Sequence, residues 1–219
     1  MRGRRLVVAT GNPGKLREIR ALLEPLPVAL CGLAELPSLA LPPEGDDYAA
    51  NAIAKARAAA AHAGCPAVGD DSGLEVEGLA GGPGPRSARF GGPELDDAGR
   101  VAHLLAALAG ASGAARRARF VCVAALALPD GGVETFRGEC AGRIAAAPRG
   151  SGGFGYDPVF ELPDLGRTMA ELSGEEKARV SHRGQAFRAL REALLRSLDA
   201  ATPPARAPRS DRTDRGGTG

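Results

Sequence analysis

The stretch RFVCVAALALPDGGVETFRGECAGRI, residues 119–144, bears most directly on the fold of this chain. Arg119–Leu128 and Val133–Ile144 have the composition of long strands. Pro129-Asp130-Gly131-Gly132 between them is a strong turn signal, so the segment predicts an antiparallel hairpin. A hairpin of this length predicts a mixed sheet rather than a purely parallel one.

On both sides of the hairpin, the sequence predicts strands alternating with helices, which indicates an α/β fold. Short apolar runs predict strands at Leu6–Ala9, Val28–Leu30 and Pro66–Val68. Helical patterns are expected at about Lys15–Leu23 and from Asp46 or Asp47 to about Ala63. A further helix is expected to begin at Asp96 or Asp97, and its inward-facing residues are Val101, Leu104, Leu105 and Leu108. The last helix is expected to begin near Arg183 and to bury Phe187, Leu190, Leu194, Leu195 and Leu198.

Composition excludes several classes of protein. The chain has 219 residues, 44% hydrophobic and 25% charged, as in soluble globular proteins. A net charge of +2 and 4% aromatic residues do not favour nucleic-acid binding. No apolar run is long enough for a membrane span or a signal peptide. The four cysteines form no CxxC pair, so we expect buried free thiols in a reducing cytoplasm. Residues 1–200 are expected to form one domain, and residues 201–219, which are almost without apolar side chains, a disordered tail.

The first candidate site is the segment from Thr10 to Lys15, between a predicted strand and a predicted helix. Backbone N–H groups and the helix dipole favour phosphate at such a junction. It is not a P-loop, because Ala9 stands where that motif needs glycine and Leu16 follows the lysine. A plain strand–turn–helix connection is the alternative. Lysine is rare here, with only Lys15, Lys55 and Lys177 among 28 basic residues, and Arg replaces lysine poorly at a tight phosphate.

The second candidate is Gly69-Asp70-Asp71-Ser72-Gly73, expected just after the Pro66–Val68 strand. Two adjacent carboxylates repel each other unless a positive charge is near, and Mg²⁺ joins carboxylates to phosphates. Alternatively, one aspartate caps a turn and the other is solvated. Glu44 offers a further carboxylate, and Asn51 and Lys55 are four residues apart on one helix face.

Two further candidates lie near the C-terminus. The Gly150–Pro158 loop lets its backbone approach a ligand closely, and its Phe154 is suited to stacking on a base. Lys177 and Ser181-His182-Arg183 offer donors for a base carbonyl. A flexible surface loop, and N-capping by Ser181 with exposed His182 and Arg183, are the respective alternatives.

Taken together, ATGNPGKLREI, NAIAKARAAA, GDDSGLEVEGLAGGPGPRSARFGG, GGFGYDPVF and SHRGQAF resemble the Ham1-like family of inosine/xanthosine triphosphate pyrophosphatases. The resemblance runs from about Leu6 to Leu198, with five separated motifs in the family's order. It implies a long mixed central sheet with flanking helices, in two lobes around an active-site cleft, and a cytoplasmic homodimer. It also implies magnesium-dependent hydrolysis of ITP, dITP or XTP to the monophosphate and pyrophosphate.

The resemblance further implies roles for individual residues. Asp71 would be the general base and, with Glu44, a metal ligand. The other implied residues would bind substrate: Thr10, Gly11, Asn12, Pro13, Gly14, Lys15, Lys55, Ser72, Phe154, Gly155, Tyr156, Asp157, Lys177, His182 and Arg183.

Two departures from the family pattern stand out. Gly69 replaces the usual alanine, a change expected to be tolerated because both residues are small. The register of the metal-binding Glu44 is uncertain by one residue, so that Asp46 or Asp47 is an alternative. Two other functions also stay open: a Maf-like nucleotide pyrophosphatase with a different base preference, and a nucleotide-binding regulatory module without turnover.

Overall fold

The hairpin predicted from residues 119–144 lies at the centre of the sheet. In the computed structural model, which describes residues 5–36 and 38–200, strands β5 (Arg117–Ala127) and β6 (Val133–Ile144) pair antiparallel along their whole length. The loop between them is closed by the N–H of Leu128, which donates to the carbonyl of Gly132 at 2.8 Å. The predicted hairpin is therefore confirmed, with its first strand beginning two residues earlier.

The sheet is mixed, as expected. Its main order is β2-β1-β3-β5-β6-β7-β8, and β4 pairs with β3 outside this path. The remaining strands are β1 (Arg5–Val8), β2 (Ala29–Gly32), β3 (Ala67–Val76), β4 (Pro83–Gly84), β7 (Phe160–Leu162) and β8 (Arg167–Thr168). Among the described strands, only β1 makes parallel pairs, with β2 and β3, and every other pairing is antiparallel.

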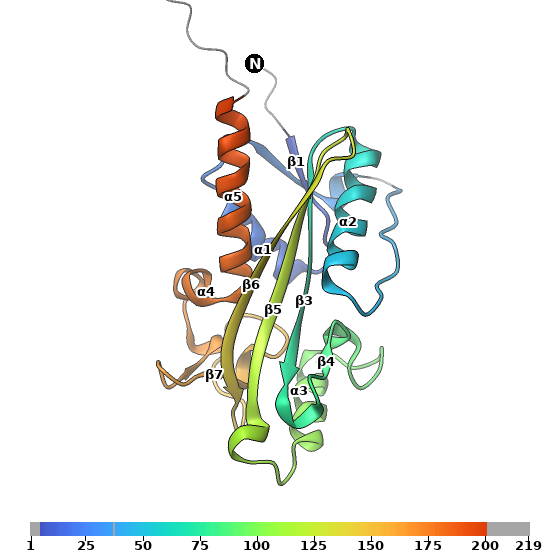
Figure 1. Cartoon of the computed structure of the whole chain (residues 1–219). Helices are drawn as coiled ribbons and strands as arrows, with labels where there is room; N and C mark the ends of the chain where they lie inside the picture. The colour runs from blue at the N-terminus through green and yellow to red at the C-terminus, as the bar shows by residue number, and fades with distance from the viewer. Residues whose placement is uncertain (1–4, 37, 201–219) are drawn as a thin grey trace, which may run out of the picture.

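Five α-helices of the described chain surround the sheet: α1 (Pro13–Leu23), α2 (Tyr48–Ala63), α3 (Asp97–Ala107), α4 (Gly174–Val180) and α5 (His182–Ala200). Figure 1 shows α5 and α2 on opposite sides of the long strands in the upper lobe, and α3 beside the lower ends of these strands. The helices thus form two lobes joined by β3, β5 and β6. No described helix is long and apolar enough to cross a membrane.

Small side chains line the contact between α2 and the sheet. Ala52, Ala56 and Ala59 are fully buried against it, and Gly69 of β3 lies directly beneath the helix. A Cβ atom at residue 69 would lie 2.8 Å from the carbonyl oxygen of Ala52, so even alanine would require backbone to move. Glycine at residue 69 therefore leaves room for the backbone of α2 above the strand.

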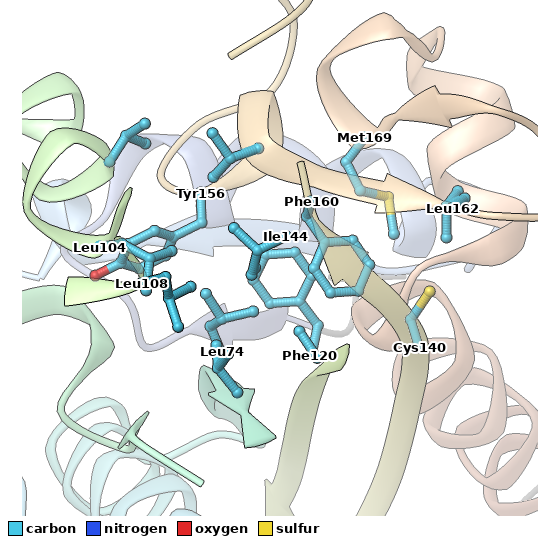
Figure 2. Packing of buried hydrophobic residues seen from close by; sticks show 14 of the residues in the cluster. Leu74, Leu104, Leu108, Phe120, Cys140, Ile144, Tyr156, Phe160, Leu162 and Met169 are labelled. Atoms are coloured by element: carbon cyan, nitrogen blue, oxygen red, sulfur yellow. The ribbon is translucent and has the colours of Figure 1, made fainter. Parts of the chain in front are cut away.

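The lower lobe has an apolar cluster of its own. Figure 2 shows Phe120, Phe160 and Ile144 packed between the strands, with Leu104 of α3 and Tyr156 nearby. The rings of Phe120 and Phe160 are 4.3 Å apart between centroids. This cluster supports the Gly150–Pro158 loop, which precedes β7 and carries Phe154 and Tyr156.

Three expectations need correction. Strand β3 does not end at Val68 but continues to Val76, because residues 67–76 all pair with β5, so both aspartates lie within a strand. Leu195 is 38% exposed rather than buried, and the side chain of Leu198 lies outside the described part. The four cysteines are free, but Cys65 is only partly buried. The expected tail, residues 201–219, also lies outside the described residues.

Candidate active site

Asp70 and Asp71 point to opposite faces of the sheet, because successive side chains of an extended strand alternate. Both are buried, with 1% and 2% of their surface exposed. Asp71 faces α2, whereas Asp70 faces α1 and α5. The two adjacent carboxylates therefore do not form one acidic pair, as the sequence suggested, but belong to two separate charge clusters.

On the α2 face, Asp71 is held by two residues of one helix face. The side-chain amide of Asn51 donates to Asp71 Oδ2 at 2.8 Å, and Lys55 Nζ donates to Asp71 Oδ1 at 3.2 Å. Lys55 Nζ also donates to Glu44 Oε1 at 2.7 Å. Lys55 is buried, so the alternative of a solvated surface lysine does not hold. We refer to Glu44, Asn51, Lys55 and Asp71 as the acidic cluster.

The other two candidate carboxylates have different partners. Asp47 caps α2 by accepting the N–H of Ala50 at 2.7 Å. Asp46 makes an exposed, bidentate ion pair with Arg86. Of the three alternatives, the structure brings only Glu44 to the lysine that also contacts Asp71.

Burial raises the pKa of Asp71 above its ordinary value, and the opposing effects of Lys55 and Asn51 do not cancel that increase. The pKa of Lys55 is raised, because the nearby carboxylates outweigh the effect of burial. A carboxylate with a raised pKa accepts a proton more readily than an ordinary aspartate, as a general base requires.

On the opposite face, Asp70 is surrounded by cations. Lys15 Nζ and Arg183 Nη2 both lie 3.2 Å from Asp70 Oδ2. Burial alone would raise the pKa of Asp70, but Lys15, Arg183 and Lys55 together hold it well below its usual range. Glu18 of α1 extends this network by contacting Lys177 and Arg183, each at 2.7 Å.

The turn before α1 owes its shape to local capping. Asn12 Oδ1 accepts the N–H of Lys15 at 3.0 Å, and Pro13 occupies the first turn of the helix. The helix therefore begins two residues earlier than predicted and presents its N-terminus beside β3. A Cβ atom at Gly14 would lie 2.6 Å from the Phe154 ring, so glycine lets that ring lie against the start of the helix.

A cavity of roughly 240 Å³ opens on the Asp70 face. Ten of the predicted substrate-binding residues line it: Asn12, Lys15, Ser72, Phe154, Gly155, Tyr156, Asp157, Lys177, His182 and Arg183. These residues come from segments far apart in the sequence, and the fold brings them to one place. Lys177 Nζ and the Arg183 guanidinium lie 5.0 and 5.5 Å from the centre of the Phe154 ring, in cation–π geometry.

Seven predicted residues do not line this cavity. Thr10, Gly11, Pro13 and Gly14 form the turn at its rim, whereas Lys55, Asp71 and Glu44 belong to the acidic cluster on the other face.

The cavity and the acidic cluster meet at an open edge of β3. On this side, β1 pairs with β3 only as far as Val68, and β4 pairs with β3 from Leu74. Among the described strands, nothing pairs with residues 69–73 on that side. An elongated ligand could therefore cross the edge and contact both faces.

His182 and Arg183 are buried, not exposed, although Ser181 does cap the start of α5. Burial and the neighbouring Arg183 and Lys177 charges lower the pKa of His182 well below its ordinary value. Its ring therefore stays neutral at pH 7 and stacks on Phe120, with 4.7 Å between centroids.

Several residues of the cavity were missed by the sequence analysis. Ser87 and Ala88 follow β4, Asp97 and Arg100 lie on α3, and Phe120 lies on β5. Glu18 was also missed, although it lies within the quoted ATGNPGKLREI motif. A helix starting at Asp96 or Asp97 was predicted, but no sequence signal indicated that this helix faces the candidate site.

Mg²⁺ fits the acidic cluster by its donor chemistry. The described residues contain no group of three or more His, Cys, Asp and Glu side chains arranged around a metal. Mg²⁺ does not require one, because it is usually bound by one or two carboxylates together with substrate phosphates and water. Asp71 and Glu44, which share Lys55 as a partner, supply two such carboxylates.

The fold and the site define a class of mixed α/β proteins with a charged cleft at the open edge of a central strand. The comparisons then identify the family. The Ham1 family model matches residues 6–193, and the chain belongs to this family, in agreement with the resemblance.

Similar proteins cover nearly the whole domain. The chain is 50% identical over 194 residues to a dITP/XTP pyrophosphatase of Thermus thermophilus, covering 88% of this chain and 93% of that protein. It is also 50% identical over 194 residues to a dITP/XTP pyrophosphatase of Deinococcus deserti, covering 88% and 90%. Among solved structures, a HAM1 protein from Coxiella burnetii is 40% identical with a TM-score of 0.79, covering 88% of this chain and 99% of that one.

Proposed function

We propose that this chain hydrolyses non-standard purine nucleoside triphosphates, namely ITP, dITP and XTP, to the monophosphate and pyrophosphate. It is a nucleoside triphosphate pyrophosphatase that cleaves between the α and β phosphates and so removes these nucleotides from the cellular pool. One observation carries the proposal: the cavity and the acidic cluster lie on the two faces of β3 at its open edge. A base and a triphosphate joined by a sugar have the shape that such a site can hold.

The base and sugar would occupy the cavity, and the phosphates the strand edge. Phe154 offers a ring face for stacking, and Tyr156 and Asp157 lie in the same loop. The residues from Thr10 to Lys15 present a helix N-terminus to the phosphates. Lys15 and Lys55 add point charges where negative charge builds up during the reaction.

Asp71 would act as the general base towards the attacking water. It is buried, its pKa is raised, and its two oxygens accept hydrogen bonds from Asn51 and Lys55, which orient the carboxylate. A proton of the water moves to the Asp71 carboxylate while the water oxygen attacks the α-phosphorus. The bond between the α-phosphorus and the oxygen that bridges to the β-phosphate breaks, and pyrophosphate leaves. Ser72 lines the cavity on the opposite face of β3 and would contact the substrate there, with its hydroxyl accepting a hydrogen bond from Arg183 Nη2 at 2.7 Å.

Asp71 and Glu44 would hold a divalent cation, and we propose Mg²⁺. When bound, it supplies positive charge that stabilises the phosphates in the transition state. Lys55, which contacts both carboxylates, keeps them in place and limits their mutual repulsion.

The test is release of pyrophosphate from ITP, dITP, XTP, GTP and ATP, with Mg²⁺ and after exhaustive chelation. We expect turnover of the first three to exceed that of ATP and to vanish on chelation. Equal turnover of all five would contradict the substrate assignment, and full activity after chelation would contradict the metal.

The two other functions lack support. A regulatory module without turnover would not need the acidic cluster, and a Maf-like enzyme would not account for membership of the Ham1 family. The same substrate panel tests both, because the first predicts no pyrophosphate and the second a different base preference.

We further propose that the protein is a cytoplasmic homodimer whose residues 1–200 form the catalytic domain, with residues 201–219 as a dispensable tail. The free state of all four cysteines supports a reducing compartment, and the family resemblance supports the dimer. Light scattering measures the mass in solution, and a chain ending at residue 200 that loses activity would contradict the role given to the tail.

A further inference from the structure

Arg100 of α3 is the cation of the cavity that the sequence analysis did not find. It lies one helical turn after Asp97, and both residues line the cavity. Asp97 Oδ2 accepts the N–H of Gly155 at 2.7 Å, and Asp97 Oδ1 lies 3.3 Å from Arg100 Nη1. The start of α3 is thereby joined to the loop that carries Phe154 and Tyr156.

The guanidinium of Arg100 differs from the other cations of the cavity in its partners. Lys15, Lys177 and Arg183 each contact buried or half-buried carboxylates. Arg100 Nε is buried and has no hydrogen-bond partner among the described residues, although the side chain as a whole is 16% exposed. A buried, charged N–H without an acceptor is costly, so its place in a ligand cavity suggests that a ligand supplies the acceptor.

The surroundings of Arg100 fit a flat ring better than a phosphate. Leu74, Phe120 and Tyr156 line the same cavity and belong to the apolar cluster of Figure 2. The Tyr156 hydroxyl is already engaged, donating to the carbonyl of Ser87 at 2.9 Å. Arg100 is close enough to Tyr156 to affect the pKa of its hydroxyl.

We propose that Arg100 determines base specificity by donating its Nε–H to an oxo group of the purine base. Hypoxanthine and xanthine carry such acceptors on the six-membered ring, whereas adenine places an amino donor at position 6. A donor facing a donor leaves both unpaired, which sites built around a hydrogen bond reject strongly. Arg183 is less suited to this role, because its Nε, Nη1 and Nη2 already donate to Asp70, Glu18 and Ser72. The inference rests on the proposed function.

The test compares Arg100→Met, which keeps an unbranched apolar stem but removes the guanidinium, with Arg100→Lys, which keeps the charge but lacks the Nε–H. Arg117→Met is the matched control, since Arg117 is exposed and pairs with Glu77 away from the cavity. Calorimetry would measure the affinity of each variant for IMP, XMP and AMP, and pyrophosphate release would give kcat/KM for ITP, XTP and ATP. Melting temperatures would show that each variant is folded.

We expect both Arg100 variants to lose about tenfold or more in affinity for IMP and XMP with little change for AMP. The preference for ITP and XTP over ATP in kcat/KM should fall by a similar factor, and Arg117→Met should match the wild type. Equal losses for all three monophosphates, no loss, or wild-type discrimination by Arg100→Lys would each overturn the proposal. If the wild type binds IMP but releases no pyrophosphate from ITP, the proposed function fails, while the affinities still decide the role of Arg100.

Discussion

The two faces of β3 place adjacent aspartates in different electrostatic surroundings. Asp70 is contacted by Lys15 and Arg183, and its pKa is lowered. Asp71 is contacted by Lys55 and Asn51 beside a second carboxylate, Glu44, and its pKa is raised. Residues that are neighbours in sequence can thus have opposite acid–base properties, because strand geometry sends their side chains into different clusters.

This contrast predicts that only one of the two aspartates is the catalytic base. Asp71→Asn keeps the size of the side chain and its hydrogen-bonding capacity but removes the basic carboxylate. We expect turnover of ITP to fall by about 10²–10⁴-fold. Initial rates of pyrophosphate release and the melting temperature should be measured together, and near-normal turnover in a folded variant would place the base elsewhere.

Asp70→Asn should act mainly on stability. It removes the carboxylate between Lys15 and Arg183 and leaves buried positive charge without its partner, so we expect a loss of about 3–5 kcal/mol in unfolding free energy. Urea unfolding at neutral pH measures this loss. An unfolding free energy equal to that of Asp71→Asn would contradict the comparison between the two faces.

The same pair differs in pH dependence. Because the pKa of Asp70 is lower in the folded than in the unfolded chain, its ionised form stabilises the fold at neutral pH. That stability is lost as the pH falls below about 4, the ordinary aspartate pKa. Asp70→Asn should therefore flatten the acid limb of the stability profile, whereas Asp71→Asn should not, since the pKa of Asp71 is raised. Urea unfolding midpoints of the wild type and both variants, measured between pH 3 and 7, test this difference.

Gly69→Ala tests the close packing of α2 over the Asp71 face. The added Cβ would lie 2.8 Å from the Ala52 carbonyl oxygen and displace the helix that carries Asn51 and Lys55. We expect a loss of about 1–3 kcal/mol in stability, together with reduced turnover. Gly174→Ala is the matched control, because a Cβ there meets nothing within 4 Å. Equal melting temperatures for the two variants would show that α2 adapts without cost.

Substitutions of Asn12 have the smallest expected effect. They distinguish the capping role of this residue from phosphate binding on the Asp70 face. Asn12→Ala removes the cap of α1 and should cost about 1 kcal/mol in stability. Asn12→Asp keeps a good cap but adds negative charge where phosphate is expected, so its stability should be preserved while KM for ITP rises. An unchanged KM in Asn12→Asp would argue against phosphate at this turn.

The local elements were largely determined by the sequence. Turn chemistry at Pro129–Gly132 predicted the hairpin and hence the mixed sheet, and helical spacing placed Asn51 and Lys55 on one face, where the structure has both contacting Asp71. These features depend on residues close together in the chain, whose preferences do not require a partner from elsewhere. The five quoted motifs also indicated the family, which the comparisons confirm.

The tertiary structure decided which residues share a cluster. A short apolar run before Asp70 suggested a strand ending at Val68, whereas pairing with β5 over the whole of residues 67–76 extends that strand and sends Asp70 and Asp71 to opposite faces. Long-range packing also brings Glu18, Asp97 and Arg100 to the candidate site, and no local pattern marks them. Burial and the surrounding charges then set the acid–base character of each carboxylate: burial raises the pKa of Asp71, whereas nearby cations outweigh burial at Asp70. Both depend on what the fold places around a residue and not on its neighbours in sequence.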